Sequence, residues 1–295
     1  QRGCDKFCTY CVVPYTRGRE RSLPLADLVR QVETAAAQGY REIVFLGQTV
    51  NSYRHGDHDF SDLLRAAQGV EGVLRIRFTS PHPSDLDERL IATFVECDKV
   101  MPHMHLPLQS ASDRILTAMN RSYTLAEYDA KLARLRAAVP GMSVSTDVIV
   151  GFPGETEEDY EQTVAYMTRA RYDSAFLFKY SARPDTKAFT WPETVSEDEK
   201  GRRLSRLIDL QHQISGEIHD GWVGREAEVL IEGISHRDER QLHGKTREFK
   251  TVVLANDGAP AGTLRRVRIT GSTPVTLFAE ALDTPRAEPL VSIAG

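Results

Sequence analysis

The sequence predicts an α/β fold in which a parallel sheet, doubly wound or curled into a complete or partial barrel, precedes a small antiparallel β-barrel. Between residues 25 and 180, apolar strand-like segments alternate regularly with amphipathic helix-like segments, as in a parallel sheet with helical crossovers. After a long polar helix at 196–219, short apolar runs separated by glycines indicate the small barrel. A chain of 295 residues can form one large core and a small second domain.

The alternating region begins with a helix at 25–38, which follows Pro24 and is stopped by Gly39. Strands are expected where short apolar runs follow helices, at 42–47, 74–79, 103–108, 143–150 and 174–180. The intervening helices are expected at 60–68, 86–96, 112–119, 125–138 and 155–171. In both architectures that fit this order, active sites lie at the carboxyl ends of the strands.

The β-type runs of the second region lie at 226–231, 249–254, 264–269 and 275–281. We therefore predict a first domain at 1–222 and a second at 223–283, followed by a loose tail at 284–295. No internal repeat is evident beyond the strand and helix units.

Three cysteines near the start of the sequence, Cys4, Cys8 and Cys11, have the spacing C-x3-C-x2-C. A cubane iron–sulfur cluster takes one thiolate on each of its four irons, so three cysteines leave one iron open to an outside ligand. A structural zinc site normally has four protein ligands, and only Glu20 within residues 12–21 offers a fourth. Because sulfur ligands suit both metals, zinc stays as the alternative.

The composition fits a cytoplasmic enzyme that binds a metal through thiols. Four cysteines, three of them clustered, do not form a disulfide framework, and Cys97 is expected in the core or at a helix end. The sequence contains no apolar run of about 18 residues, the length needed to cross a bilayer. The sequence contains no phosphate-binding loop and no nucleophile elbow, so nucleotide hydrolysis and acyl transfer have no support.

Positive charge is concentrated beside the cysteines although the net charge is -5. Arg17 and Arg19 follow the cysteine motif, and Lys245, Arg247 and Lys250 lie in the second domain. These side chains could bind the phosphates of a nucleic acid, while a solvated charged face is the alternative.

Several motifs together resemble the radical S-adenosylmethionine methylthiotransferases, most closely those of the MiaB type. They are Gln1–Glu20 with the three cysteines, Leu46–Tyr53, His105–Ser110, Met119–Tyr123 and Thr146–Thr156. The second domain, with Val229–Gly233 and Leu242–Thr246, resembles the TRAM domain, an OB-like RNA-binding barrel. The resemblance covers nearly the whole chain.

The resemblance implies a partial parallel (β/α) barrel that holds a [4Fe-4S] cluster on Cys4, Cys8 and Cys11, with S-adenosylmethionine chelating the open iron. It implies a tRNA methylthiotransferase that modifies C2 of N6-isopentenyladenosine next to the anticodon. The implied partners are tRNA and an electron donor such as a flavodoxin, and a monomer is expected. Relatives that modify threonylcarbamoyl-adenosine in tRNA, or a ribosomal protein, are alternatives within the family. A zinc-stabilised RNA-binding module without catalysis is the alternative from another class.

The resemblance also implies residue roles near the ends of strands. The cofactor-binding residues would be Tyr10, Gln48, Gln109, Ser110, Asp147 and Gly151, and the RNA-binding residues would be Arg17, Arg19, Lys245 and Arg247. No catalytic residue is assigned beyond the cluster. Each cofactor-binding residue also has a structural alternative, such as a strand cap, a turn or a side chain that packs on the surface. For Gly151 the alternative is a strand-to-helix turn with Glu155 or Thr156 near the helix start.

His103 and His105 share one face of a predicted strand. Two histidines without a third ligand nearby are expected to make hydrogen bonds within the strand rather than to bind a metal.

In the family, a second cluster in an N-terminal domain supplies the sulfur, and a strand runs directly into the cysteine loop. Neither precedes Cys4 in this sequence, so the first strand is expected to be truncated. Cys97 alone cannot replace three further cysteines, and we therefore expect cleavage of S-adenosylmethionine without completed sulfur insertion.

Overall fold

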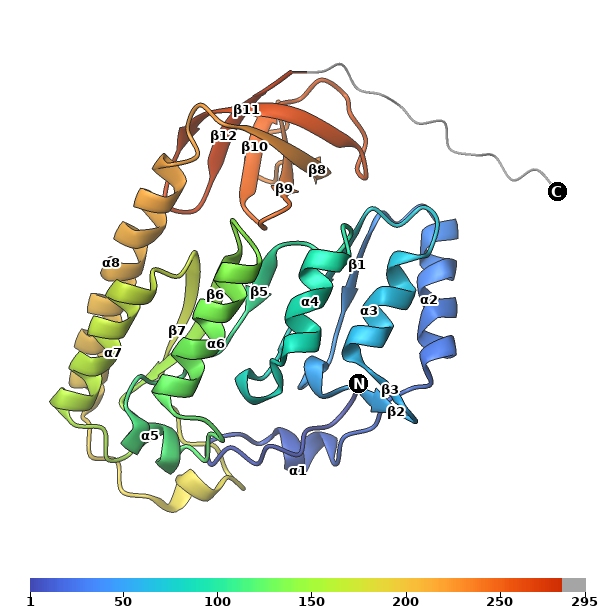
Figure 1. Ribbon diagram of the computed structural model, residues 1–295. Coiled ribbons are helices and arrows are strands. Elements are labelled where there is room, and N and C mark those ends of the chain that lie inside the picture. Colours follow the sequence, from blue (N-terminus) through green and yellow to red (C-terminus); the bar gives the residue numbers. More distant parts are fainter. Residues whose placement is uncertain (283–295) are drawn as a thin grey trace.

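The first unit of the molecule is a curved parallel sheet covered by helices on its outer face (Figure 1). The structure, a computed structural model, describes residues 1–282, so the predicted tail at 284–295 lies outside the described residues. The strands in sheet order are β1 (Glu42–Phe45), β4 (Arg75–Phe78), β5 (His103–His105), β6 (Ser143–Val150) and β7 (Ser174–Lys179). The helices are α2 (Leu25–Ala37), α3 (Phe60–Gln68), α4 (Glu88–Glu96), α5 (Asp113–Ala118), α6 (Leu125–Ala138) and α7 (Glu157–Ala170).

Two hydrogen-bonded groups of strands join to make this sheet. β1 pairs with β4, and β5 pairs with β6, which pairs with β7, all in parallel. The backbone of Ile76 in β4 bonds to residues 99–101, just before β5, through Ile76 N to Lys99 O (2.6 Å) and Met101 N to Ile76 O (3.0 Å). The strands therefore follow one another in chain order, which confirms the predicted partial parallel barrel.

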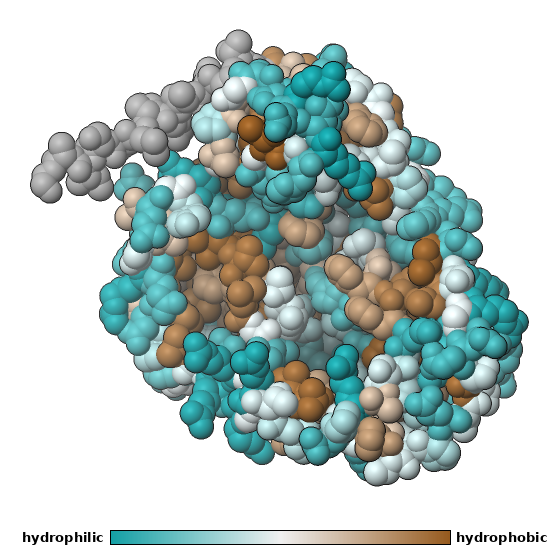
Figure 2. All heavy atoms as spheres, turned by 180° about the vertical axis from the view of Figure 1, so that it is seen from behind, coloured by the Kyte–Doolittle hydropathy of each residue, from teal (hydrophilic) through white to brown (hydrophobic). Residues whose placement is uncertain are grey.

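The concave face of the sheet exposes apolar side chains at both edge strands. Side chains alternate between the two faces of a strand, so Ile43 and Phe45 pack into the core beneath the helices while Val44 points the other way and is 43% exposed. On β7, Phe176 and Phe178 are two residues apart and therefore share one face of the strand, where they are 58% and 50% exposed. Figure 2 shows apolar side chains on both sides of a hollow in this face.

The second unit is a closed five-stranded barrel that follows the long helix α8 (Glu197–Asp220). Its strands are β8 (Glu226–Ile234), β9 (Gln241–Thr246), β10 (Thr251–Ala255), β11 (Leu264–Ser272) and β12 (Leu277–Ala281). Four of the five strand pairs are antiparallel, but β10 and β12 run parallel where the barrel closes. The prediction of a small β-barrel is therefore confirmed. The prediction that all of its strands are antiparallel is wrong for the pair β10 and β12.

Most predicted elements are present with boundaries shifted by a few residues, and three features were not predicted. The short helix α1 (Val13–Arg17) follows the cysteines and has Pro14 in its first turn, where the missing N–H of proline costs nothing. A small hairpin, β2 (Arg54–His55) with β3 (His58–Asp59), precedes α3. β9 was missed because its sequence lacks a β-branched apolar run and contains Gly244.

The two units meet at the amino ends of the core strands. Arg75 and Arg77 at the start of β4 are only 1% and 4% exposed. Arg75 Nη1 donates to the carbonyl of Lys245 (2.7 Å), and Arg77 Nη2 donates to that of Thr246 (2.9 Å). Figure 1 shows the small barrel at this end and α1, which follows the cysteines, at the other. None of the helices within residues 1–282 is long and apolar enough to cross a membrane.

Candidate active site

The cysteine loop lies across the carboxyl ends of the core strands. After β1, the side chain of Gln48 accepts a hydrogen bond from Gly3 N (2.8 Å), and Thr49 Oγ1 lies 3.2 Å from Cys4 Sγ. After α5, the carbonyl of Met119 accepts from Thr9 N (3.0 Å). These contacts place the three thiols where active sites of parallel α/β folds occur.

The shape of the loop depends on Gly3, which has φ +80°. A Cβ atom at this position would lie 2.1 Å from the carbonyl oxygen of Arg19, far inside van der Waals contact. The two arms of the loop are joined next to this contact by paired hydrogen bonds between Arg2 and Arg21 (2.9 and 2.7 Å). Glycine is therefore required for the backbone to turn back on itself before Cys4.

The three thiols are free and differ in their surroundings. Cys4 is buried beside Thr49, whereas Cys8 and Cys11 are half-buried. Arg121 Nη1 donates to Cys8 Sγ (3.4 Å), and Cys11 N donates to the carbonyl of Cys8 (3.0 Å). Burial raises the pKa of the Cys11 thiol, and the neighbouring thiols Cys8 and Cys4 add to this effect.

These residues fit a cubane cluster better than a single metal ion. Among residues 1–282, no three His, Cys, Asp or Glu side chains are arranged so that they could hold one ion. In a cubane each thiolate binds its own iron, so the three sulfur atoms surround the cluster instead of meeting at one point. Cys97 ends α4 and is buried in the hydrophobic core, as predicted, so it is not a ligand of the same site.

The predicted cofactor residues Gln109 and Ser110 are both buried beyond β5. Gln109 has φ +66°, and its side-chain Oε1 is buried with no hydrogen-bond partner among the described residues. Ser110 Oγ accepts from Ser112 N (3.2 Å). Gln109 thus keeps one acceptor free at the strand ends, whereas Ser110 takes part in the turn before α5.

Asp147 and the two histidines lie on β5 and β6. His105 contacts Asp147 (Nε2 to Oδ2, 3.2 Å) and Ser145 (Nδ1 to Oγ, 2.9 Å). His103 lies 3.4 Å from the same Ser145 hydroxyl and stacks on Phe249, and burial lowers its pKa to about 3. Both histidines therefore make hydrogen bonds within the sheet, as expected.

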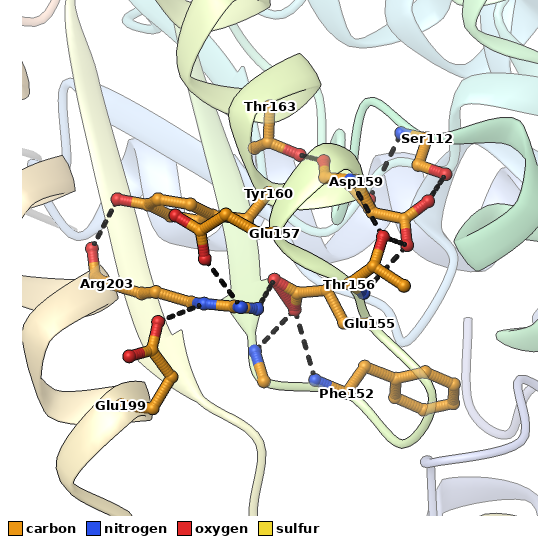
Figure 3. Close-up of polar contacts among 12 residues, drawn as sticks. Ser112, Phe152, Glu155, Thr156, Glu157, Asp159, Tyr160, Thr163, Glu199 and Arg203 are labelled. Carbon is orange, nitrogen blue, oxygen red and sulfur yellow. Dashed lines mark hydrogen bonds and ion pairs between the residues drawn. The ribbon is translucent and has the colours of Figure 1, made fainter. Parts of the chain in front are cut away.

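Gly151 directly follows β6 and begins the turn into α7. Figure 3 shows Phe152, Glu155 and Thr156 along this turn. The N–H of Gly151 donates to Glu155 Oε2, which also accepts from Phe152 N (3.2 Å). Arg203 from α8 donates to the other oxygen of Glu155 (2.9 Å). Thr156 is the N-cap of α7, so this segment has the strand-to-helix turn that was the structural alternative for Gly151.

Tyr10 lies between the cysteine loop and the core. Its ring makes an edge contact with Phe152 (centroids 6.4 Å apart), and burial raises the pKa of its hydroxyl. Tyr10 also lines a cavity of about 390 Å³ with Cys11, Ile149 and Phe178. The aromatic face beside the third cysteine thus borders a space that is open to a bound molecule.

The four predicted RNA-binding residues lie at opposite ends of the molecule. Arg17 and Arg19 are exposed beside the cysteine loop, and Arg19 pairs with Asp5 (2.9 Å). Lys245 and Arg247 lie in the small barrel, at its contact with the core, and Arg247 Nη2 donates to the carbonyl of Asp98 (2.9 Å). Burial lowers the pKa of Lys245. The structure therefore does not bring the four into one surface.

The residues that sequence reasoning missed are Thr49 and Arg121, whose side chains contact the sulfur of Cys4 and Cys8 respectively. Both lie inside motifs that were noted for their resemblance to the family, Leu46–Tyr53 and Met119–Tyr123. The motifs were the only available signal, because the contacts join residues 45 and 113 positions apart.

Comparison with known proteins agrees with this geometry. A sequence model described as the Radical SAM superfamily matches residues 1–167, and one described as the TRAM domain matches residues 222–282. Among solved structures, coproporphyrinogen III oxidase (HemN) from Escherichia coli aligns with a TM-score of 0.58 at 12% identity over 91% of this chain and 65% of its own. The methyltransferase TsrM from Kitasatospora setae aligns with a TM-score of 0.55 at 20% identity over 64% of this chain and 37% of its own. At such low identity these likenesses support the fold alone.

Curated relatives are much more similar in sequence. A tRNA-2-methylthio-N(6)-dimethylallyladenosine synthase from Alkaliphilus oremlandii is 47% identical over 95% of this chain and 60% of its own length. One from Porphyromonas gingivalis is 44% identical over 97% of this chain and 63% of its own length. The chain thus spans about three fifths of the length of these relatives. The match over residues 1–167, which includes all three clustered cysteines, shows that the chain belongs to the Radical SAM superfamily.

Proposed function

We propose that Cys4, Cys8 and Cys11 bind a [4Fe-4S] cluster whose fourth iron takes S-adenosylmethionine. The observation that carries this proposal is the placement of three free thiols on one loop across the carboxyl ends of a parallel barrel. When bound, such a cluster supplies the electron that cleaves S-adenosylmethionine into methionine and a 5′-deoxyadenosyl radical. The protein residues bind the cofactor, orient it and exclude water.

We propose the following cofactor contacts for residues around the loop. The free Oε1 of Gln109 and the hydroxyl of Ser110 are acceptors for the ribose hydroxyls. The exposed Gln48 holds the methionine part, because its amide nitrogen stays available while its oxygen accepts from Gly3 N. Tyr10, Asp147 and Gly151 border the adenine. The cavity beside Tyr10 and Cys11 supports this placement.

We propose that the substrate is tRNA carrying N6-isopentenyladenosine next to the anticodon, and that the product carries a methylthio group on C2. The names and high identity of the curated relatives support this choice over threonylcarbamoyl-adenosine or a ribosomal protein. The exposed apolar side chains of the concave face, Val44, Phe176 and Phe178, suit an isopentenyl group better than a charged threonylcarbamoyl group.

We propose two separate RNA contacts. Arg17 and Arg19 would bind phosphates near the modified base, and the second domain, proposed at 223–283 beside a core at 1–222, would bind tRNA through Lys245 and Arg247. The match to a TRAM domain supports the second contact. The separation of the two pairs across the length of the core suits a large folded RNA.

We propose that the reaction takes place in the cytoplasm, in a monomer reduced by a donor such as a flavodoxin. The four unpaired cysteines suit a reducing compartment. The 295 residues hold thiol ligands for one cluster only, because Cys97 is buried in the core. This polypeptide alone should therefore cleave S-adenosylmethionine without completing sulfur insertion.

Mass spectrometry of tRNA nucleosides tests the substrate. A strain from which the gene is deleted should lose 2-methylthio-N6-isopentenyladenosine and accumulate N6-isopentenyladenosine, and the full-length gene should reverse both changes. Loss of a methylthiolated threonylcarbamoyl-adenosine instead would show that the substrate is wrong.

A further inference from the structure

The segment Ala118–Tyr123, which we call the clasp, holds the middle of the cysteine loop. The carbonyl of Met119 accepts from Thr9 N (3.0 Å), and Asn120 Nδ2 donates to the carbonyl of Phe7 (2.9 Å). Asn120 has φ +56°, a left-handed value that asparagine adopts more readily than most residues. The clasp therefore fixes the loop on both sides of Cys8.

Arg121 of the clasp points its guanidinium at the sulfur of Cys8. Nη1 lies 3.4 Å from Cys8 Sγ, while Nε donates to the hydroxyl of Tyr123 (3.0 Å) and the guanidinium lies over the Tyr123 ring (5.1 Å). The Tyr123 hydroxyl in turn donates to the carbonyl of Pro107 (2.9 Å). The orientation of the guanidinium is thus fixed from two sides, and its contact with sulfur follows from this framework.

The positive charge of Arg121 has no carboxylate partner within residues 1–282. Its second terminal nitrogen, Nη2, is buried and makes no hydrogen bond there. A guanidinium stays protonated in proteins, so a half-buried cation lies against one proposed cluster ligand without a carboxylate partner. The buried Arg203, by contrast, pairs with the carboxylate of Glu155. A negatively charged group bound beside Arg121 would compensate its positive charge.

We infer that Arg121 raises the reduction potential of the cluster held by Cys8, as a positioning residue and not as a catalytic one. The inference rests on the proposed cluster site. Reduction adds one electron to the cluster and makes it more negative, with the electron taken from a donor such as a flavodoxin or dithionite. A nearby cation and a charge-assisted N–H···S hydrogen bond stabilise the reduced form more than the oxidised form.

Redox titration of the reconstituted polypeptide, followed by the electron paramagnetic resonance signal of the reduced cluster, tests the inference. In Arg121→Met the equilibrium constant for reduction should fall about tenfold or more, a shift of about 59 mV to more negative potential for one electron. Arg121→Lys keeps the charge and loses the fork geometry, so its potential should lie between those of Arg121→Met and the wild type. The matched control is Arg183→Met, because Arg183 is exposed and lines the cavity beside Cys11. Its potential should not change, since water screens an exposed charge.

An unchanged potential in a cluster-loaded Arg121→Met, or an equal shift in Arg183→Met, would contradict the inference. If Arg121→Met loads no cluster, the potentials of Arg121→Lys and Arg121→Gln are measured instead. Wild-type potentials in both of these variants would also contradict the inference. Loss of loading in all three variants, with an intact circular dichroism spectrum, would assign Arg121 to building the site and overturn a tuning role. Failure of the wild type to bind any cluster would refute the proposed function instead.

Discussion

Gly3 is the single residue on which the position of the cysteine loop depends most directly. Its φ of +80° and the 2.1 Å approach of a hypothetical Cβ to the Arg19 carbonyl leave no room for a side chain. We expect Gly3→Ala to open the loop at a cost of about 2 kcal/mol, because both strain and a backbone clash oppose the native turn. Iron and sulfide content per polypeptide after anaerobic reconstitution should fall severalfold.

The control for Gly3 is Gly201 in α8, where an added Cβ would meet nothing within 4 Å. Gly201→Ala should leave cluster loading unchanged and stabilise the helix by about 1 kcal/mol. Equal loading in Gly3→Ala and the wild type would show that the loop does not need this backbone conformation.

At the residue scale, the sequence allowed the thiols to be predicted but not their neighbours. Cys4, Cys8 and Cys11 share one short motif, so their spacing alone indicates a metal centre with an open position. Thr49 and Arg121 reach sulfur only through tertiary structure, and the family motifs that contain them do not show which of their residues contacts a cysteine. The roles of the proposed cofactor-binding residues rest on the family resemblance and stay predictions.

At the scale of elements, Asp159 joins the start of α7 to that of α5 (Figure 3). It accepts from Ser112 Oγ (2.6 Å), which caps α5, from Thr156 N (2.8 Å), which caps α7, and from Arg114. Burial opposes ionisation of this carboxyl, but the hydrogen bonds from Arg114, Ser112 and Thr156 outweigh it and lower its pKa to about 2. One charged side chain thus stabilises two helix starts beside the proposed site.

Asp159→Asn should destabilise the protein by about 2 kcal/mol at pH 7, as measured by urea unfolding of the reduced protein. The folded pKa is lower than the ordinary value of 3.8, so the stabilisation is complete above pH 4 to 5 and is lost as the pH falls towards 2. The difference between wild type and variant should therefore shrink below pH 4.

Glu158→Gln is the matched control for Asp159, because Glu158 is exposed in the same helical turn. Glu158→Gln should change the free energy of unfolding by less than about 0.5 kcal/mol both at pH 7 and below pH 4. A difference between wild type and Asp159→Asn that does not depend on pH would contradict the assigned role of the Asp159 charge.

Elements of the core were predictable because each carries its own signal. α3 and α6 have the predicted bounds, since their apolar periodicity is bounded by Asp59 and Thr124, which cap them. β9 carries no such signal and depends on its neighbours. A Cβ at Gly244 would lie 2.2 Å from the carbonyl oxygen of Leu230 on β8, so this strand pair requires glycine there.

At the scale of the whole molecule, two buried arginines join the core to the small barrel. Arg75 and Arg77 donate to carbonyls of residues 245–247 and pair with Glu228 and Glu42 respectively. Hydrogen bonds from charged donors are worth about 1.5–3 kcal/mol each. The barrel should therefore move rigidly with the core as long as these contacts are intact.

The double variant Arg75→Met with Arg77→Met should uncouple the two units, since it leaves these carbonyls without donors. Small-angle X-ray scattering should show a larger radius of gyration, and limited proteolysis should cut between α8 and β8. Arg268→Met, which removes an exposed pair with Glu226 within the barrel, should do neither. An unchanged radius and cleavage pattern in the double variant would show that other contacts hold the units together.

The relative placement of the two units could not be predicted from the sequence. The alternation of strands and helices indicates the first unit, and the spacing of glycines indicates the second. The contact between the units depends on two arginines in β4, Arg75 and Arg77. The sequence of this strand does not indicate what these arginines bind. Sequence reasoning named Lys245 and Arg247 as RNA-binding residues of the second domain, but it could not show that this domain packs at the end of the core opposite the cysteines.

Anaerobic reconstitution with iron and sulfide, followed by reduction with S-adenosylmethionine present, tests the central claim most directly. The polypeptide should become brown and release 5′-deoxyadenosine, detected by liquid chromatography and mass spectrometry, and serine at Cys4, Cys8 or Cys11 should abolish both. It should form no 2-methylthio-N6-isopentenyladenosine from tRNA without further sequence. A colourless, zinc-replete protein that releases no 5′-deoxyadenosine would contradict the account.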